Sequence, residues 1–185
     1  MIGRDFDGVL ARAAAGSSDD FARLYRDVHP ALIRYLNVMA YEQADDVAAE
    51  AWLAAVTSLS AFSGTETSFR SWLFTIARNK LIDAQRKASR RPTTPLTEAH
   101  DRTGRDAADA ADQVVEAFST ERALALIAEL PKDQAEAVML RVVVGLDVAD
   151  AAEVMDRSPG AVRVLAHRGL KRLAQRLADE ENHEV

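Results

Sequence analysis

Hydrophobic residues recur every three or four positions through most of this chain, a spacing that places them along one side of an α-helix. The longest such stretch runs from Thr67 to Arg91. Its predicted buried positions are Phe69, Trp72, Leu73, Ile76 and Ala77. Thr67 or Ser68 is expected to cap its first turn, because a hydroxyl can accept a hydrogen bond from an unpaired backbone amide there. The stretch holds seven basic residues and one acid, so we expect a basic solvent side.

Two helices are predicted near the N-terminus. The first spans Asp5 to Ala15, and its buried positions are Phe6, Val9, Leu10 and Ala13. The second begins after Ser17 or Ser18 and continues to Leu36. Pro30 lies inside this second pattern and has no amide hydrogen to donate, so we expect the helix to kink or break there.

A third helix is predicted from Asp45 to Leu59. Its expected core positions are Val47, Leu53 and Val56. Asp46 and Glu50 stand one turn apart on one side of it. An acid in the first turn interacts favourably with the helix dipole, which accounts for Asp46, but Glu50 lies too far along the helix for that explanation.

The C-terminal third has the pattern of a helical domain that ends in a helix-turn-helix. Helices are predicted from Glu121 to Leu130 and from Lys132 to Val144, with Gly145 ending the second. Their expected core is Leu124, Ile127, Leu130, Val138, Met139, Val142 and Val143. A short helix capped by Asp147, a turn at Asp156 and a longer helix follow, and this order is typical of a helix-turn-helix.

The last helix has charges of one sign. Ser158 is its predicted cap and Pro159 its first residue. Six basic residues and no acid lie between Arg157 and Ala178. The inward positions are expected to be Val162, Leu165, Leu173 and Leu177, and the outer face Arg163, His167 and Lys171. A helix that binds protein could be this basic, but a helix-turn-helix with this charge is more typical of one that enters the major groove of DNA.

The composition of the chain argues against several classes of protein. Hydrophobic residues make up 48% of the 185, which indicates a globular chain, and no apolar run is long enough to cross a membrane. There is no cysteine, which excludes disulfides and cysteine-ligated zinc and fits a cytoplasmic location. No catalytic triad, metal-ligand cluster or phosphate-binding glycine loop is visible. We therefore expect no enzyme activity, no catalytic residue, no metal and no cofactor.

The net charge of −6 averages over segments of opposite sign. Pro92 and Pro95 end any helix after Arg91. From Leu96 to Glu121 there are seven acids and two bases, a surplus of five negative charges. This stretch predicts a flexible acidic linker.

Several motifs resemble the sigma-70 family of RNA polymerase sigma factors, and most closely its extracytoplasmic-function (ECF) group. The stretch from Trp72 to Arg86, W-L-x-x-I-A-R-N-x-x-x-D-x-x-R, is similar to the helix that binds and opens the promoter −10 element. The preceding loop, Ser60 to Ser68, matches the one that forms a pocket for a flipped base in the family. The segment DDVAAEAWLAAV is similar to the helix that binds core polymerase, although Ala49 stands where the family usually has Gln.

The C-terminal segment GLDVADAAEVMDRSPGAVRVLAHRGLKRL is similar to the domain that reads the promoter −35 element. Asp156 replaces the usual turn glycine, and Val164, Leu165 and Ala166 stand where Ser-Arg-Leu is common. These differences bear on which bases are read rather than on the fold. The resemblance covers about nine-tenths of the chain, and it implies that the acidic linker threads the polymerase near its RNA path.

We therefore predict an all-α protein of two small domains: residues 1–91, a linker of 92–118, and a helix-turn-helix domain of 119–185. The resemblance implies −10 contacts by Ser63, Thr65, Arg70, Arg78, Asn79, Lys80, Arg86 and Lys87. It implies −35 contacts by Ser158, Ala161, Arg163, Val164, His167, Arg168 and Lys171. Polymerase contacts are implied for Asp46, Glu50 and Trp52, although Trp52 fits a core position equally well.

The implied partners are core RNA polymerase, promoter DNA and, as a further option, an anti-sigma factor. Two other classes remain open on the residues alone. One is a helix-turn-helix repressor or activator whose N-terminal domain dimerises or senses a signal, and the other is a helical adaptor that binds only proteins. The basic stretch from Thr67 to Arg91 and the acidic linker favour the sigma factor.

Overall fold

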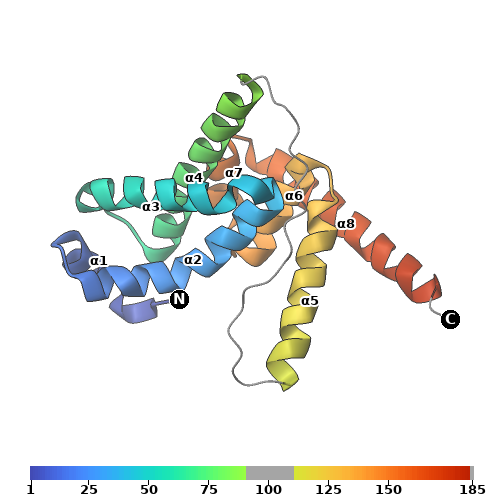
Figure 1. Ribbon diagram of the computed structural model, residues 1–185, viewed down its shortest axis with the longest axis horizontal. Coiled ribbons are helices and arrows are strands. Elements are labelled where there is room, and N and C mark those ends of the chain that lie inside the picture. Colours follow the sequence, from blue (N-terminus) through green and yellow to red (C-terminus); the bar gives the residue numbers. More distant parts are fainter. Residues whose placement is uncertain (91–110, 184–185) are drawn as a thin grey trace.

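The computed structural model describes the backbone of residues 1–90 and 111–183 and the side chains of residues 1–89 and 120–179 (Figure 1). Every regular element in these residues is helical, which confirms the predicted all-α class. The long N-terminal helices are α1 (Phe6–Ala14), α2 (Ser18–Ala40), α3 (Ala44–Ser58) and α4 (Glu66–Arg90). Three 3₁₀ turns join them, at Gly3–Asp5, Tyr41–Gln43 and Leu59–Ala61. The C-terminal elements are α5 (Ala111–Ala128), α6 (Lys132–Val138), a π-helical turn (Met139–Val143), α7 (Val148–Met155) and α8 (Pro159–His183).

The N-terminal domain packs α1 to α4 around one core. The four predicted positions of α1 are all buried. Leu24, Leu32 and Leu36 of α2 meet Phe69 and Leu73 of α4 in this core, where each is at most 1% exposed. The Ser17 hydroxyl accepts from the Asp20 amide and so caps α2.

Of the two outcomes expected at Pro30, a kink or a break, the break does not occur, since α2 is one helix from Ser18 to Ala40. The helix continues through it to Ala40 because buried residues hold both sides of the proline. Val28 is 1% exposed and Leu32 is fully buried, so packing offsets the single backbone hydrogen bond that proline removes.

Two predictions about the N-terminal helices are wrong in detail. Leu53 and Val56 were expected in the core, yet they are 68% and 49% exposed. Alanines 48, 51 and 55 occupy the buried side of α3 instead, because small side chains let α3 lie close to its neighbours. The cap of α4 is Thr65 rather than Thr67 or Ser68: its hydroxyl accepts from the Ser68 amide at 3.2 Å.

In the C-terminal domain, α7, a turn and α8 form the predicted helix-turn-helix. Asp147 caps α7 by accepting from the Asp150 amide at 2.8 Å, and Ser158 caps α8 by accepting from the Ala161 amide at 3.2 Å. Asp156 makes the turn in a left-handed conformation, φ +51°. Short polar residues such as Asp tolerate that region better than most, which explains how this chain turns without the usual glycine.

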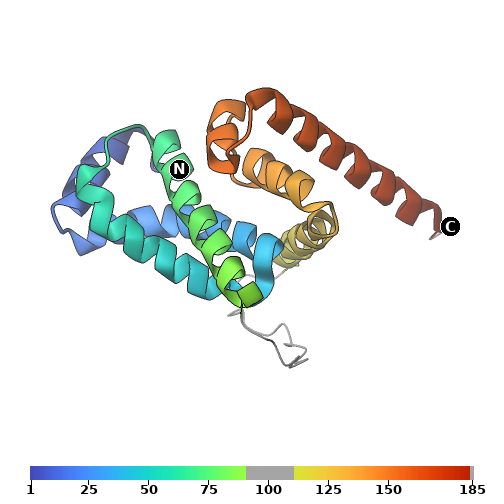
Figure 2. The same ribbon diagram turned by 90° about the horizontal axis from the view of Figure 1, so that it is seen from above.

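Two residues predicted to lie in this domain's core are on its surface. Val142 is 58% exposed, because the chain forms a π-helical turn from Met139 that shifts the register of the stripe. Leu177 is 45% exposed, because α8 extends beyond the rest of the domain (Figure 2). Val162 is fully buried as expected, and Leu165 and Leu173 are half-buried.

Helix α5 begins at Ala111, inside the stretch that was predicted to be linker. Most of the acids assigned to the linker lie in residues 91–110, outside the described residues. The domain limits 1–91, 92–118 and 119–185 therefore remain a prediction.

The two domains pack against each other. Helix α7 lies along α4, and α5 and α6 contact α2 (Figures 1 and 2). The side chain of Glu136 on α6 is buried in this contact, where it bonds Tyr35 of α2 and Arg78 of α4.

Candidate functional site

The outer face of α8 is a continuous row of exposed basic and polar side chains. Arg163, His167, Arg168 and Lys171 are all exposed, and Val164, at 47% exposed, lies among them. No ion pair involves these cations within the part of the chain that the structure describes. Their charges are thus available to a ligand. Ser158 is exposed with its hydroxyl engaged in the cap, and Ala161 is half-buried.

The rest of the helix-turn-helix holds this face in place. Arg157, at the turn, pairs with Asp133 of α6 at 2.8 Å, and Arg176 pairs with Glu129. Gly169 lets α8 approach α6 closely, since a Cβ there would lie 2.7 Å from Val138 Cγ2. The α8 backbone is therefore fixed on its inner side, while its outer side faces solvent.

Two of the basic residues predicted to read the −10 element are engaged with carboxylates. The Arg70 guanidinium bonds Asp27 of α2 at 2.5 Å, and its side chain is 11% exposed. The Arg78 Nε donates to Glu136 at 2.7 Å, and its side chain is 20% exposed. Neither side chain is part of the basic solvent side expected for this helix, because both reach acids on neighbouring elements.

The other predicted −10 residues lie on the accessible part of α4 and on its preceding loop. Asn79, Arg86 and Lys87 are exposed, and Lys80 is half-buried at 3.5 Å from Glu50. Arg86 also lies 3.6 Å from Asp83, one turn away. In the loop, Ser63 and Thr65 are exposed, and the Thr65 hydroxyl is occupied by the cap of α4.

An aromatic cluster supports that loop. Phe62, at the end of the loop's 3₁₀ turn, packs at ring-centroid distances of 4.9 Å from Trp72 and 5.6 Å from Phe69. Trp72 and Phe62 are both half-buried. The loop thus has a rigid apolar base beneath short polar side chains.

Helix α3 presents an acidic and apolar surface to solvent. Asp46 and Glu50 are exposed, as predicted, and Leu53 and Val56 continue the same side of the helix. A groove between α3 and α4 adjoins it, with Glu50 on one wall and Lys80 and Lys87 on the other. Sequence reasoning missed the two apolar residues of this surface. The available signal was the spacing of four alanines, 44, 48, 51 and 55, which mark the buried side of α3.

Trp52, predicted to contact polymerase, is 6% exposed and lies beneath this surface. Its indole Nε1 donates to His29 Nδ1 at 3.3 Å, and its ring packs against Tyr25 and Phe21. Tyr25 in turn stacks on His29 with ring centroids 4.4 Å apart. Burial lowers the pKa of His29, while the charge of Asp45 acts in the opposite direction. Trp52 therefore positions α3 and cannot be an exposed contact in this arrangement.

No group of His, Cys, Asp and Glu among the described residues could hold a metal ion. None of the described helices is both long and apolar enough to cross a membrane.

Comparison with known proteins identifies two domain families in the order of the two helical domains. Residues 21–91 match sigma-70 region 2, and residues 120–173 match sigma-70 region 4. The chain is similar to the ECF RNA polymerase sigma factor SigD of Mycobacterium tuberculosis, at 36% identity over 94% of this chain and 84% of that protein. It is also similar to ShbA of Streptomyces griseus, at 33% identity over 89% of this chain and 91% of the relative.

Solved structures share the fold. CnrH, in complex with the cytosolic domain of CnrY, aligns with a TM-score of 0.62 over 92% of this chain and 96% of that one, at 24% identity. RpoE of Bartonella quintana, in complex with the anti-sigma factor NepR, aligns with a TM-score of 0.63 over 86% and 97%, at 23% identity. The matched domains, their order and the relatives that span the chain agree: the protein belongs to the ECF group of the sigma-70 family, the non-catalytic subunits that direct RNA polymerase to promoters for transcription initiation.

Proposed function

We propose that this sigma factor divides its work among three surfaces, each on a different helix. The exposed side of α3 binds core polymerase, the outer face of α8 reads the upstream −35 element, and the accessible part of α4 with its preceding loop engages the −10 element. The observation that carries this division is the separation of charge. Acids and apolar groups gather on α3, whereas unpaired cations gather on α8.

The polymerase surface consists of Asp46, Glu50, Leu53 and Val56. Interfaces combine an apolar centre with a polar rim, and charge complementarity there sets orientation and partner choice. The exposed leucine and valine supply the apolar part, and the two carboxylates supply the rim. Trp52 contributes from beneath by holding α3 against α2.

The upstream element is read by α8. A recognition helix enters the major groove with its N-terminal half toward the base edges. Arg163 and Val164 lie in that half, and an arginine can bond guanine with two hydrogen bonds while an apolar side chain can contact a thymine methyl. Further along, Arg168 and Lys171 are placed to contact phosphates, with His167 between the two sets. Ser158 and Ala161 present the helix N-terminus to the DNA backbone.

The −10 element is engaged by Asn79, Lys80, Arg86 and Lys87 on α4, with Ser63 and Thr65 in the loop. The aromatic base under the loop supports a pocket for an unstacked nucleotide. Arg70 is assigned to holding α4 on α2 through Asp27, not to DNA. Arg78 can contribute only after its pair with Glu136 is broken.

This function places the protein with polymerase and the genome, in the cytoplasm. The acidic net charge fits a protein that binds promoter DNA poorly alone, because non-specific attraction to phosphates scales with neutralised charge. Polymerase then supplies the remaining affinity.

Two matched variants test the division of labour. Asp46→Ala with Glu50→Ala should weaken binding to core polymerase by about 2 kcal/mol or more and leave helicity unchanged, since both side chains are exposed. Lys171→Ala should leave polymerase affinity unchanged and weaken the holoenzyme on promoter DNA. Polymerase affinity is measured by titrating labelled sigma factor with core enzyme, and DNA affinity with the assembled holoenzyme. Unchanged polymerase affinity in the double variant would remove α3 from the interface.

A further inference from the structure

A single buried carboxylate joins the two domains. Glu136 of α6 is 4% exposed, and its Oε1 accepts from the Tyr35 hydroxyl at 2.8 Å and from the Arg78 Nε at 2.7 Å. Tyr35 comes from α2 and Arg78 from α4, so both donors belong to the N-terminal domain. The acceptor belongs to the C-terminal domain.

This arrangement is complete only while the domains touch. A buried carboxylate is costly unless it is paired and hydrogen-bonded, and here both donors, Tyr35 and Arg78, lie across the interface. Tyr35 is itself fully buried, and burial followed by the neighbouring Glu136 carboxylate raises the pKa of its hydroxyl well above the ordinary range. The phenol therefore stays protonated and can donate at neutral pH.

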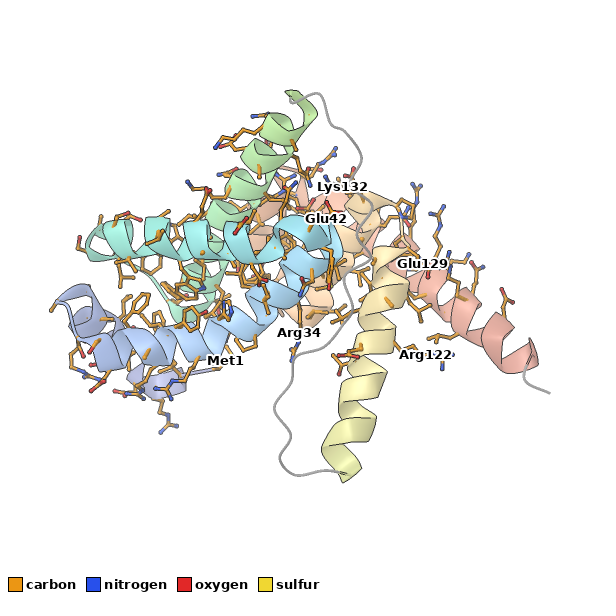
Figure 3. The ribbon with its side chains drawn as sticks, in the orientation of Figure 1. Met1, Arg34, Glu42, Arg122, Glu129 and Lys132 are labelled. Atoms are coloured by element: carbon orange, nitrogen blue, oxygen red, sulfur yellow. The ribbon has the colours of Figure 1, made fainter. Side chains whose placement is uncertain are left out.

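Other contacts extend the same interface. Lys132, labelled in Figure 3 at the start of α6, donates to the Gln85 side chain of α4 at 2.9 Å. Helix α7, the first helix of the helix-turn-helix, packs directly along α4. The helix proposed to engage the −10 element is thus covered in part by the domain proposed to read the −35 element.

The packed arrangement cannot be the one that works on a promoter. Two elements about two turns of DNA apart are separated by ~70 Å, at ~34–36 Å per turn. Domains that share a buried ion pair cannot occupy both elements at once. The domains must separate, and separation exposes Glu136 and frees Arg78.

We propose that the free sigma factor rests in a closed form, latched by Glu136 on Tyr35 and Arg78, which masks a DNA-contacting arginine of α4 until polymerase separates the domains. This inference rests on the proposed function for its consequence, since masking matters only if α4 engages DNA. The existence of the latch depends only on the contacts between the two domains and not on whether α4 engages DNA.

The absence of cysteine makes a direct distance measurement possible. Ser60→Cys and Gln175→Cys place one label on each domain, at exposed positions outside the interface. Pulsed electron resonance then reports the distance between the labels in the free full-length chain. The latch variant is Glu136→Gln, which keeps the shape of the side chain and removes its charge. The control is Glu129→Gln, whose exposed carboxylate, labelled in Figure 3, pairs with Arg176 inside the same domain.

The unaltered latch should give one narrow distance distribution, and so should Glu129→Gln. Glu136→Gln should shift the population to longer, broader distances, by about tenfold or more in the open-to-closed ratio, because a neutral amide replaces the carboxylate that pairs with Arg78. Tyr35→Phe should shift it in the same direction by less, because the ion pair remains. Circular dichroism of each variant verifies that both domains stay folded. A broad distribution in the unaltered protein, or a narrow one in Glu136→Gln, would overturn the latch.

Masking is tested separately with the same proteins. Glu136→Gln should bind a short fluorescent single-stranded DNA of mixed sequence severalfold more tightly than Glu129→Gln. Equal affinity in an opened Glu136→Gln protein would overturn masking. Arg78→Gln, assayed as assembled holoenzyme on a promoter, asks whether Arg78 contacts DNA at all. Unaltered promoter opening there would reject the DNA role of Arg78, while the distance measurements would still judge the latch.

Discussion

Gly169 of α8 lies so close to Val138 of α6 that a Cβ on the glycine would stand 2.7 Å from the valine Cγ2 and 3.3 Å from the backbone oxygen of Gln134. The glycine has room for no side chain because two helices meet there. We expect Gly169→Ala to lower the free energy of unfolding by about 1–2 kcal/mol, since overpacking commonly costs ~1–3 kcal/mol and alanine's higher helix propensity returns only ~1 kcal/mol.

The matched control for that prediction is Gly160→Ala, in the first turn of the same helix. A Cβ at Gly160 would meet nothing within 4 Å. Denaturant unfolding followed by circular dichroism should show this variant to be as stable as the unaltered protein or more stable. Equal stability of the two alanine variants would show that α6 and α8 can move apart without cost.

Leu53→Ser tests whether the exposed apolar residue of α3 serves binding. Leu53 is 68% exposed, so its replacement should change the free energy of unfolding by no more than about 0.5 kcal/mol. Its affinity for core polymerase should fall by about 1–2 kcal/mol, because a buried apolar contact would be lost at the interface. Leu177→Ser, at another exposed leucine, is the control and should leave polymerase affinity unchanged.

Arg163 and Lys171 should differ in how they contribute to upstream recognition. Arg163→Ala should reduce discrimination between cognate and mismatched −35 sequences by about 1–3 kcal/mol, whereas Lys171→Ala should weaken binding by a similar factor on all sequences. The measurement is holoenzyme affinity for a panel of promoters that differ only in the upstream element. A uniform loss for Arg163→Ala would make it a phosphate contact.

The His29 and Trp52 pair predicts a pH dependence of stability. The pKa of His29 is lowered by burial in the folded protein, so below about pH 6.5 the unfolded chain takes up a proton that the folded chain resists. The stability that uncharged His29 contributes at neutral pH is therefore lost as the pH falls below about 6.5. His29→Asn keeps an acceptor for the Trp52 indole and does not titrate there. Lowering the pH from neutral to about 5.5 should destabilise the unaltered protein more than this variant, and thermal unfolding at each pH measures the difference.

The segment between the domains must allow both promoter elements to be occupied. With residues 111–118 in α5 at ~1.5 Å each and residues 91–110 contributing at most ~3.3–3.6 Å each, the reach is roughly 80 Å, above the ~70 Å required. Deleting residues 97–110 would cut the reach to roughly 30 Å. This variant should still bind polymerase yet fail to use both elements together. Normal initiation from a two-element promoter would refute the spanning argument.

The sequence predicted most of what depends on local pattern. The four buried residues of α1, the caps at Asp147 and Ser158, and the exposed row on α8 follow from helical spacing and side-chain chemistry, and the structure confirms them. The predictions from helical spacing were wrong where tertiary packing decides which side of a helix is buried. Leu53 is exposed because alanines serve the core of α3, and Val142 is exposed because a π-helical turn shifts the stripe.

Long-range pairs could not be predicted at all. Tyr35 and Glu136 are 101 positions apart, and nothing in either local sequence indicates that they bond. The same holds for Arg78, which the motif alone places on a DNA-binding helix and which the structure pairs with a carboxylate of the other domain. Which cations are available to a ligand is therefore a property of the fold and not of the motif.

As an ECF sigma factor, this chain should make core polymerase start transcription at particular sites. Purified core polymerase, mixed with the chain and a library of genomic DNA fragments, should produce transcripts whose sequenced 5′ ends fall at discrete positions. Those positions should share two sequence elements at a fixed spacing, and Asp46→Ala with Glu50→Ala should abolish them. Start sites no more selective than those of core polymerase alone would show that the chain does not direct initiation, and sequence-specific DNA binding by the free chain as a dimer would instead indicate a repressor or activator.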